Sequence, residues 1–155
     1  MTIRTEQEAL YLACQMETGA VQLYQRALAL MKQLGRESEP LYGRLTLMRS
    51  DEEDHLRQFR ELYTGLDAPL ERELELAAIA EGVLFEGGMM GASRQGLLGS
   101  VDSMMALAKK AETLSAQKYR EFAAVSASEG AKNALLMIAE QEEKHLEELE
   151  EQAKA

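Results

Sequence analysis

The chain has 155 residues, a length that fits one domain with a sizeable core. Its 17 Lys and Arg against 27 Asp and Glu give a formal net charge of -10, which disfavours nucleic acid and anionic membrane surfaces as partners. The single cysteine, Cys14, permits neither an internal disulfide nor a thiolate metal site. The chain start lacks a signal-peptide pattern, and no apolar run approaches the ~20 residues that cross a bilayer, so we expect a cytoplasmic protein.

Two long helices are predicted in the first part of the chain. Apolar residues recur at helical spacing over about 4–34 and again over about 40–63. Gly35 is a stop signal for the first helix, and Pro40 suits the first turn of the second. We therefore expect an antiparallel helical hairpin.

The second part of the chain predicts another hairpin after a long connection. Residues 64–99 are expected to form a crossover with one short helix, because five glycines in 87–99 disfavour a long regular helix there. Ser100 is a candidate cap for the next long helix. The expected helices cover residues 4–34, 40–63, 70–86, 100–127 and 131–152. We expect a single all-α domain over 1–155.

Both histidines of the chain stand in one repeated motif. DEEDHL contains His55, and QEEKHL, ninety positions later, contains His145. Residues three apart on a helix share a face, so Glu52 pairs with His55 and Glu142 with His145, while the second glutamate of each motif points elsewhere. Apolar residues one turn before and after each pair indicate that this shared face is buried. A lone Glu-x-x-His is commonly an exposed pair, but two copies that use every histidine favour a site.

A second repeat supports a duplicated hairpin. METGAVQLY and AETLSAQKY align Glu17 with Glu112 and Tyr24 with Tyr119. Each of these glutamates also lies on the apolar stripe of its helix. The predicted core therefore contains four carboxylates and two imidazoles.

Buried carboxylates need a cationic partner. Desolvation costs several kcal/mol per ion, against a domain stability of only about 5–15 kcal/mol. No lysine or arginine lies near these residues on the predicted stripes, so we expect metal to supply the positive charge. Two divalent ions would neutralise four carboxylates, and oxygen and nitrogen ligands without thiolate suit iron or manganese.

The pattern resembles the ferritin-like di-iron carboxylate proteins, in which two helices each give a Glu and two others each give a Glu-x-x-His. The rubrerythrin family is the nearest resemblance, over about residues 5–150. It implies a four-helix bundle of two antiparallel hairpins joined by a long crossover. The implied metal ligands are Glu17, Glu52, His55, Glu112, Glu142 and His145. Glu52 and Glu142 would bridge the metals, Glu17 and His55 would hold one, and Glu112 and His145 the other.

The resemblance also implies an activity. Members reduce hydrogen peroxide, or react with O2, at a di-iron pair, and Tyr24 and Tyr119 would hydrogen-bond the ligand carboxylates. Two departures matter: one cysteine cannot form the rubredoxin domain that rubrerythrins proper carry, and Ser115 stands where a further glutamate is usual. Electrons would then come from an external protein such as a rubredoxin. A homodimer is implied, and exchange of hairpins through the glycine-rich segment remains an alternative.

Two other functions stay open at this stage. A ferroxidase or iron-handling protein would use Fe(II) as its substrate, and a structural protein would only hold the metal. In the second case partners would bind through the 64–99 crossover. Cys14, one turn from Glu17, is expected to be a core residue, and 87–99 an ordinary loop.

Overall fold

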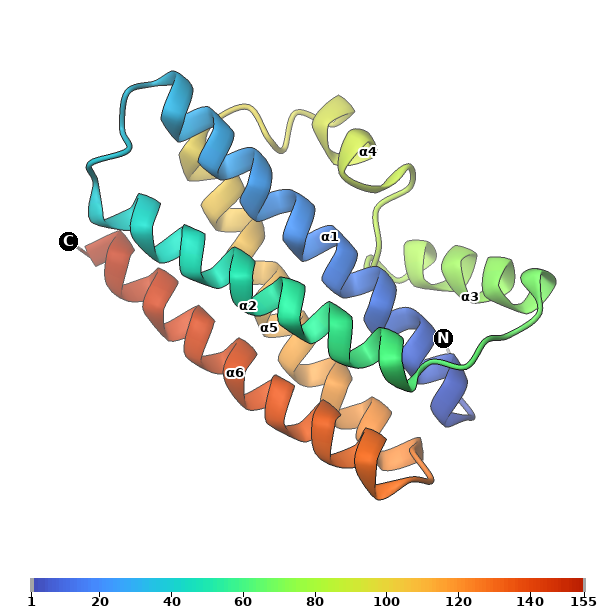
Figure 1. Cartoon of the computed structure of the whole chain (residues 1–155). Helices are drawn as coiled ribbons and strands as arrows, with labels where there is room; N and C mark the ends of the chain where they lie inside the picture. The colour runs from blue at the N-terminus through green and yellow to red at the C-terminus, as the bar shows by residue number, and fades with distance from the viewer. Residues whose placement is uncertain (1, 155) are drawn as a thin grey trace.

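The computed structural model describes residues 2–154 and consists of helices joined by loops. Four long helices form a bundle: α1 (Glu6–Gln33), α2 (Pro40–Leu62), α5 (Val101–Val125) and α6 (Glu129–Lys154). Helix α1 packs on α2 and α5, and α6 packs on α5 and α2, which closes the bundle (Figure 1). This arrangement confirms the predicted ferritin-like bundle of two hairpins.

The helix ends follow from local signals in the sequence. Gly35, at φ +68, ends α1, because its N–H bonds to the Lys32 carbonyl and the Arg36 N–H to that of Met31. Pro40 is the first residue of α2, as predicted. Ser100 caps α5 through a reciprocal pair of bonds with Ser103.

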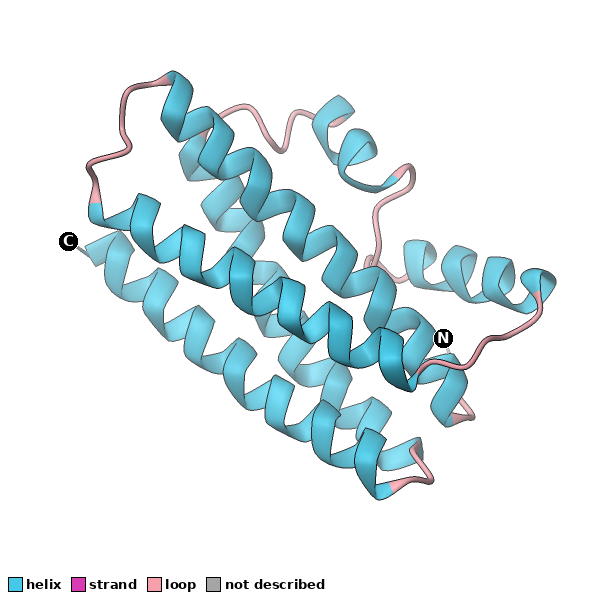
Figure 2. Cartoon of the chain, in the orientation of Figure 1, coloured by secondary structure: helices cyan, strands magenta, loops and turns pink. Residues whose placement is uncertain are grey.

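The crossover differs from the prediction of one helix. It contains two, α3 (Ala68–Ala80) and α4 (Gly88–Arg94), which pack on the outer side of α1 (Figure 2). The predicted 70–86 helix ends early because Gly82, at φ +76, stops it: the Val83 N–H bonds to the Ala78 carbonyl. The glycine-rich segment is not a plain loop, because burial of Met89 and Ala92 stabilises a short helix within it.

The core consists of two apolar clusters with polar residues between them. On α2, Leu45 and Met48 belong to one cluster, and Leu56 and Phe59 to the other. Glu52 and His55 lie between the two pairs and are themselves fully buried.

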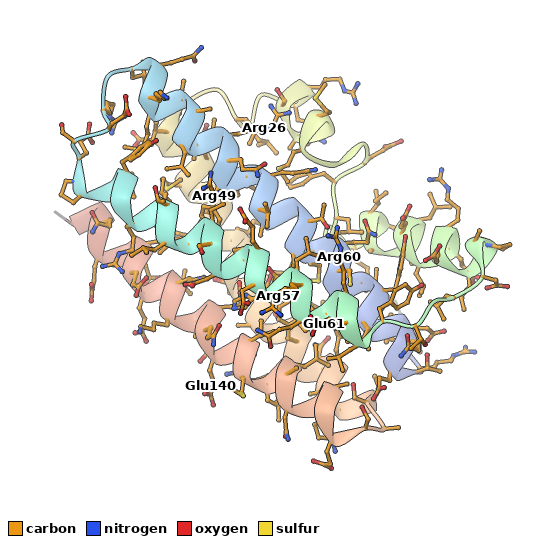
Figure 3. All side chains as sticks on the ribbon, in the orientation of Figure 1. Arg26, Arg49, Arg57, Arg60, Glu61 and Glu140 are labelled. Atoms are coloured by element: carbon orange, nitrogen blue, oxygen red, sulfur yellow. The ribbon has the colours of Figure 1, made fainter. Side chains whose placement is uncertain are left out.

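Charged side chains otherwise lie on the outer faces of the bundle (Figure 3). Arg57 and Glu61, one turn apart on α2, form an exposed ion pair at 3.2 Å. Pairs of this kind contribute roughly 0.3–0.5 kcal/mol each. The acidic surface therefore follows from solvation, whereas the buried acids of the interior need a separate explanation.

Cys14 lies in the core and is only 7% exposed, as expected of a core residue. Burial raises the pKa of its thiol to about 11, with the Glu17 charge acting in the same direction and Arg60 opposing it. Because the thiolate is the reactive form, a raised pKa lowers reactivity at neutral pH. At pH 8 we expect a thiolate fraction about 200-fold below that of a free cysteine. Labelling by a thiol-specific disulfide reagent should be slow in the native protein and fast in urea; equal rates would contradict a buried thiol.

Candidate metal centre

Each helix of the bundle presents one buried glutamate to the interior. Glu17, Glu52, Glu112 and Glu142 come from α1, α2, α5 and α6, and none is more than 2% exposed. His55 is 0% and His145 3% exposed. The neighbouring glutamates of the two motifs, Glu53 and Glu143, face solvent. The structure thus brings all six sequence-predicted metal residues to one place.

These six residues form two overlapping groups of four. Glu17, Glu52, His55 and Glu142 make one group, and Glu52, Glu112, Glu142 and His145 make the other. Within each group, one ligand atom per residue lies within 4.8 Å of the others. Glu52 and Glu142 belong to both groups, which is the position that a bridging carboxylate requires.

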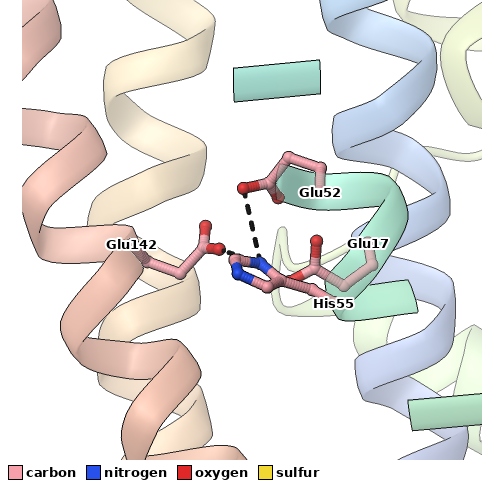
Figure 4. Close-up of side chains that lie close together, drawn as sticks. All are labelled: Glu17, Glu52, His55 and Glu142. Atoms are coloured by element: carbon pink, nitrogen blue, oxygen red, sulfur yellow. Dashed lines mark ion pairs between the residues drawn. The ribbon is translucent and has the colours of Figure 1, made fainter. Parts of the chain in front are cut away.

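The Nδ1 atom of His55 faces three carboxylates (Figure 4). It lies 2.8 Å from Glu142 Oε1, and 3.6 Å from both Glu17 Oε1 and Glu52 Oε1. The second histidine repeats this arrangement: His145 Nδ1 lies 3.0 Å from Glu52 Oε1 and 3.5 Å from Glu112 Oε1. Each imidazole is therefore closest to the glutamate of the opposite hairpin's motif.

The Nε2 atom of each imidazole, which points away from the four glutamates, contacts a residue that the sequence analysis did not predict. His55 Nε2 contacts Gln141 Oε1, and His145 Nε2 lies 2.9 Å from Asp51 Oδ2. An Nε2–H that donates to these acceptors leaves the Nδ1 lone pair free for a metal. Asp51 and Gln141 are the first residues of DEEDHL and QEEKHL. Their equivalent positions in the two copies of the motif are the sequence feature from which equivalent roles could have been predicted.

The tyrosines link the hairpins. The Tyr24 hydroxyl, on α1, donates to Glu112 Oε1 on α5 at 2.5 Å, and the Tyr119 hydroxyl donates to Glu17 Oε1 at 2.8 Å. Each tyrosine thus contacts the glutamate of the opposite hairpin, not the one on its own helix. The hydrogen bonds restrict both carboxylates to one orientation, in which Oε2 is left for another partner.

Burial shifts the protonation of the centre. It raises the pKa of Glu52 and of Glu142 well above the usual carboxyl range, and the other glutamates add to the rise. For His145, burial opposes the charged form, but the Glu112 and Glu52 carboxylates beside its Nδ1 atom outweigh this effect and raise the pKa to about 11. In the metal-free protein, protons therefore supply positive charge at this centre, and a bound metal would displace them.

The buried oxygen and nitrogen atoms of this centre that lack a hydrogen-bond partner are suited to bind two metal ions. Some of these atoms lie close together, as His55 Nδ1 and Glu142 Oε1 do, but their contacts do not meet hydrogen-bond geometry. The buried atoms without a hydrogen-bond partner in this sense include Glu17 Oε2, both oxygens of Glu52, His55 Nδ1, Glu112 Oε2, Glu142 Oε1 and His145 Nδ1. Among the described residues, the histidines are the only cationic side chains within 4.0 Å of the four glutamates. Unpaired buried acceptors cost free energy in an apolar interior, and a metal shared by each group would satisfy them.

A scan against models of protein families matches residues 8–153 to the family described as Rubrerythrin. The chain belongs to the rubrerythrin family. The match spans both hairpins and the crossover, so this rubrerythrin-family chain is a ferritin-like protein with a metal centre of the di-iron type. No curated protein and no solved structure gave a significant match. Across residues 2–154, the helices of this rubrerythrin-family protein are too short or too polar to cross a membrane.

An Asp51→Ala variant of this rubrerythrin-family protein should lower affinity for the metal near His145. Without the carboxylate, the Nε2–H of that imidazole can bond only to water, and its ring orientation becomes less fixed. Loss of a residue that hydrogen-bonds a metal ligand typically lowers metal affinity about 10–100-fold. Asp51 is half-exposed, so we expect its replacement to lower the affinity by an amount near the lower end of this range. A chelator competition titration would measure it, with the exposed Glu53→Ala as control; equal affinities would contradict the assigned hydrogen bond.

Proposed function

We propose that this protein is a di-iron oxidoreductase that reduces hydrogen peroxide with electrons from a separate donor protein. The observation that carries the proposal is the pair of buried carboxylate and histidine groups that share Glu52 and Glu142. Family membership supports the same type of centre. Oxygen and imidazole ligands without thiolate suit iron, with manganese as the alternative ion.

The side chains of this protein would hold the two metal ions. Glu52 and Glu142 would bridge the ions, with Glu17 and His55 on one and Glu112 and His145 on the other. Two irons that cycle between +2 and +3 would supply the two electrons that cleave one O–O bond. Tyr24 and Tyr119 would keep the terminal carboxylates oriented during the cycle through their hydroxyl hydrogen bonds.

We propose that the electrons come from outside this domain, because its single cysteine cannot build a rubredoxin centre within residues 1–155. A rubredoxin is the donor class that we propose. A homodimer is the proposed assembly. O2 is the alternative oxidant, and the same single-turnover experiment with O2 in place of peroxide would test it.

Single-turnover kinetics would test the proposal. Protein loaded anaerobically with two Fe(II) per chain should be mixed with one equivalent of hydrogen peroxide and followed by stopped-flow absorbance. We expect rapid formation of a diferric spectrum, repeated cycles after reduction by rubredoxin, and iron that stays with the protein on gel filtration. A variant that lacks the shared ligand, Glu142→Gln, is the negative control, and Glu143→Gln, its exposed neighbour, is the positive one.

Other results would assign the centre differently. Growth of a ferric mineral with excess Fe(II), with iron released from the two-ion centre, would identify an iron-handling protein. Two bound ions that react with neither peroxide nor O2 would identify a structural metal site. Either outcome would overturn the peroxidase proposal while leaving the metal ligands in place.

A further inference from the structure

A large pocket connects the metal centre with the molecular surface. It lies between α1 and α5 under the crossover and has a volume of about 930 Å³. Its inner end is lined by Glu112, Ser115 and Glu142, all buried. Its rim includes Leu76 of α3 and Met90 of α4, which are 50% and 59% exposed. We call this space the crossover pocket.

The crossover pocket is too large for hydrogen peroxide alone. Two oxygen atoms occupy roughly 60 Å³, taking about 30 Å³ for each water-sized unit. Pockets that bind organic molecules have volumes of about 300–1,000 Å³. A space of about 930 Å³ lies in that range.

Small residues on the bundle and large apolar ones on the crossover shape this space. Gly19 and Ala20 of α1 and Ala111 of α5 line the pocket and leave the groove between those helices open. Phe85 and Met89 of the crossover line the same pocket and give it an apolar wall, which we call the roof. Met side chains adapt to varied apolar shapes, so the wall suits a hydrocarbon group without a fixed outline.

Polar side chains line the wall of the pocket as well as its ends, and they include Gln22, Arg72 and Glu75. At the inner end, Glu112 Oε2 is buried and has no hydrogen-bond partner. At the outer end Arg26, labelled beside α4 in Figure 3, has its Nη2 atom 3.2 Å from Met90 Sδ. A molecule with an apolar body could contact Phe85 and Met89 while its polar reactive head reaches Glu112 and Glu142 at the metal centre.

We propose that the crossover pocket binds an organic hydroperoxide, with its apolar group along the crossover and its O–O group beside Glu112 and Glu142. This inference rests on the proposed function and names the substrate class of the same centre. The O–O bond would break, and two electrons from the external donor and two protons would convert ROOH into ROH and water. Hydrogen peroxide would react at the same end and leave most of the pocket unused.

A pocket-filling variant tests the assignment. The Cβ of a residue at position 19 would lie 3.7 Å from Met89 Cε, the flexible end of another pocket-lining side chain, so we expect a Gly19→Leu side chain to occupy pocket space beside Met89. Gly43→Leu, on α2 with open space around it, is the matched control. Cumene hydroperoxide is the substrate used to measure turnover. Binding is measured separately, by calorimetric titration of the oxidised, iron-loaded protein with the alcohol product, which does not react.

We expect the natural protein to bind the alcohol and to reduce both peroxides. In Gly19→Leu, alcohol binding should be lost, and the ratio of kcat/KM for cumene hydroperoxide to that for hydrogen peroxide should fall about tenfold or more, as steric exclusion from a pocket predicts. Gly43→Leu should keep both values.

Four results would overturn the proposal. Absence of alcohol binding, or an unchanged ratio in Gly19→Leu, would overturn the pocket assignment alone. A dimer that Gly19→Leu converts to a monomer in light scattering would show that a second copy covers the pocket. Absence of turnover with either peroxide would overturn the proposed function itself, and the separate binding measurement distinguishes that failure from the others.

Discussion

A Glu142→Gln variant is expected to bind fewer than two metal ions per chain, while the natural protein binds two. Glu142 belongs to both groups of ligands, so its loss affects both ions. The amide has the shape of the carboxylate but no charge to offset that of a cation. The affinity should therefore fall by more than the ~10–100-fold that loss of an outer partner costs. Metal analysis after dialysis would measure it, with exposed Glu143→Gln as the control.

The metal-free form of the same variant should be more stable than metal-free natural protein at neutral pH. Burial and the other glutamates raise the pKa of Glu142 in the folded state. A raised carboxyl pKa favours the folded state below about pH 4, the unfolded pKa, and this contribution is lost as the pH rises. Glutamine does not titrate, so the difference in unfolding temperature should be larger at pH 8 than at pH 5.

The two measurements on Glu142→Gln have opposite signs, which separates a metal ligand from an ordinary core residue. A core residue would lower the stability of the metal-free protein when replaced and would leave metal content alone. A variant that keeps two ions, or whose metal-free form is less stable at pH 8 than the natural protein, would contradict the proposed centre.

A Gly91→Ala variant is expected to destabilise the crossover and leave the metal centre intact. A Cβ on Gly91 would lie 1.7 Å from the carbonyl oxygen of Glu86 and 2.9 Å from its carbonyl carbon. These are backbone atoms, so the turn before α4 would have to open and displace the buried Met89 and Ala92. Overpacking of this kind costs typically about 1–3 kcal/mol.

Urea unfolding would measure the effect of Gly91→Ala, with Gly43→Ala as the matched control. Position 43 has open space within α2, and replacing a helical glycine with alanine there should stabilise by roughly 0.5–1 kcal/mol. Metal content should stay at two ions per chain in both variants, because α4 contributes no ligand. Unchanged stability in Gly91→Ala would show that the close packing at this turn does not restrict the residue.

The helices of the crossover are the part of the fold that sequence patterns did not predict correctly. Leu84 lies on the same side of the predicted helix as Leu70 and Leu74, so the pattern extends the helix to residue 86 and past Gly82, where the structure ends it. The short α4 had no helical signal, because its glycines disfavour a helix. It forms because Met89 and Ala92 are buried against the bundle, a contact between distant segments.

The sequence by itself determined the bundle and the candidate ligands, because helical spacing fixes which residues share a face. DEEDHL and QEEKHL place Glu52 with His55 and Glu142 with His145 within single helices. Tertiary structure alone decided that each imidazole Nδ1 lies nearest the opposite motif's glutamate, and that Asp51 holds His145. It also decided that Tyr24 reaches Glu112. These contacts join helices up to about a hundred residues apart, and local periodicity carries no information about which helices pack together.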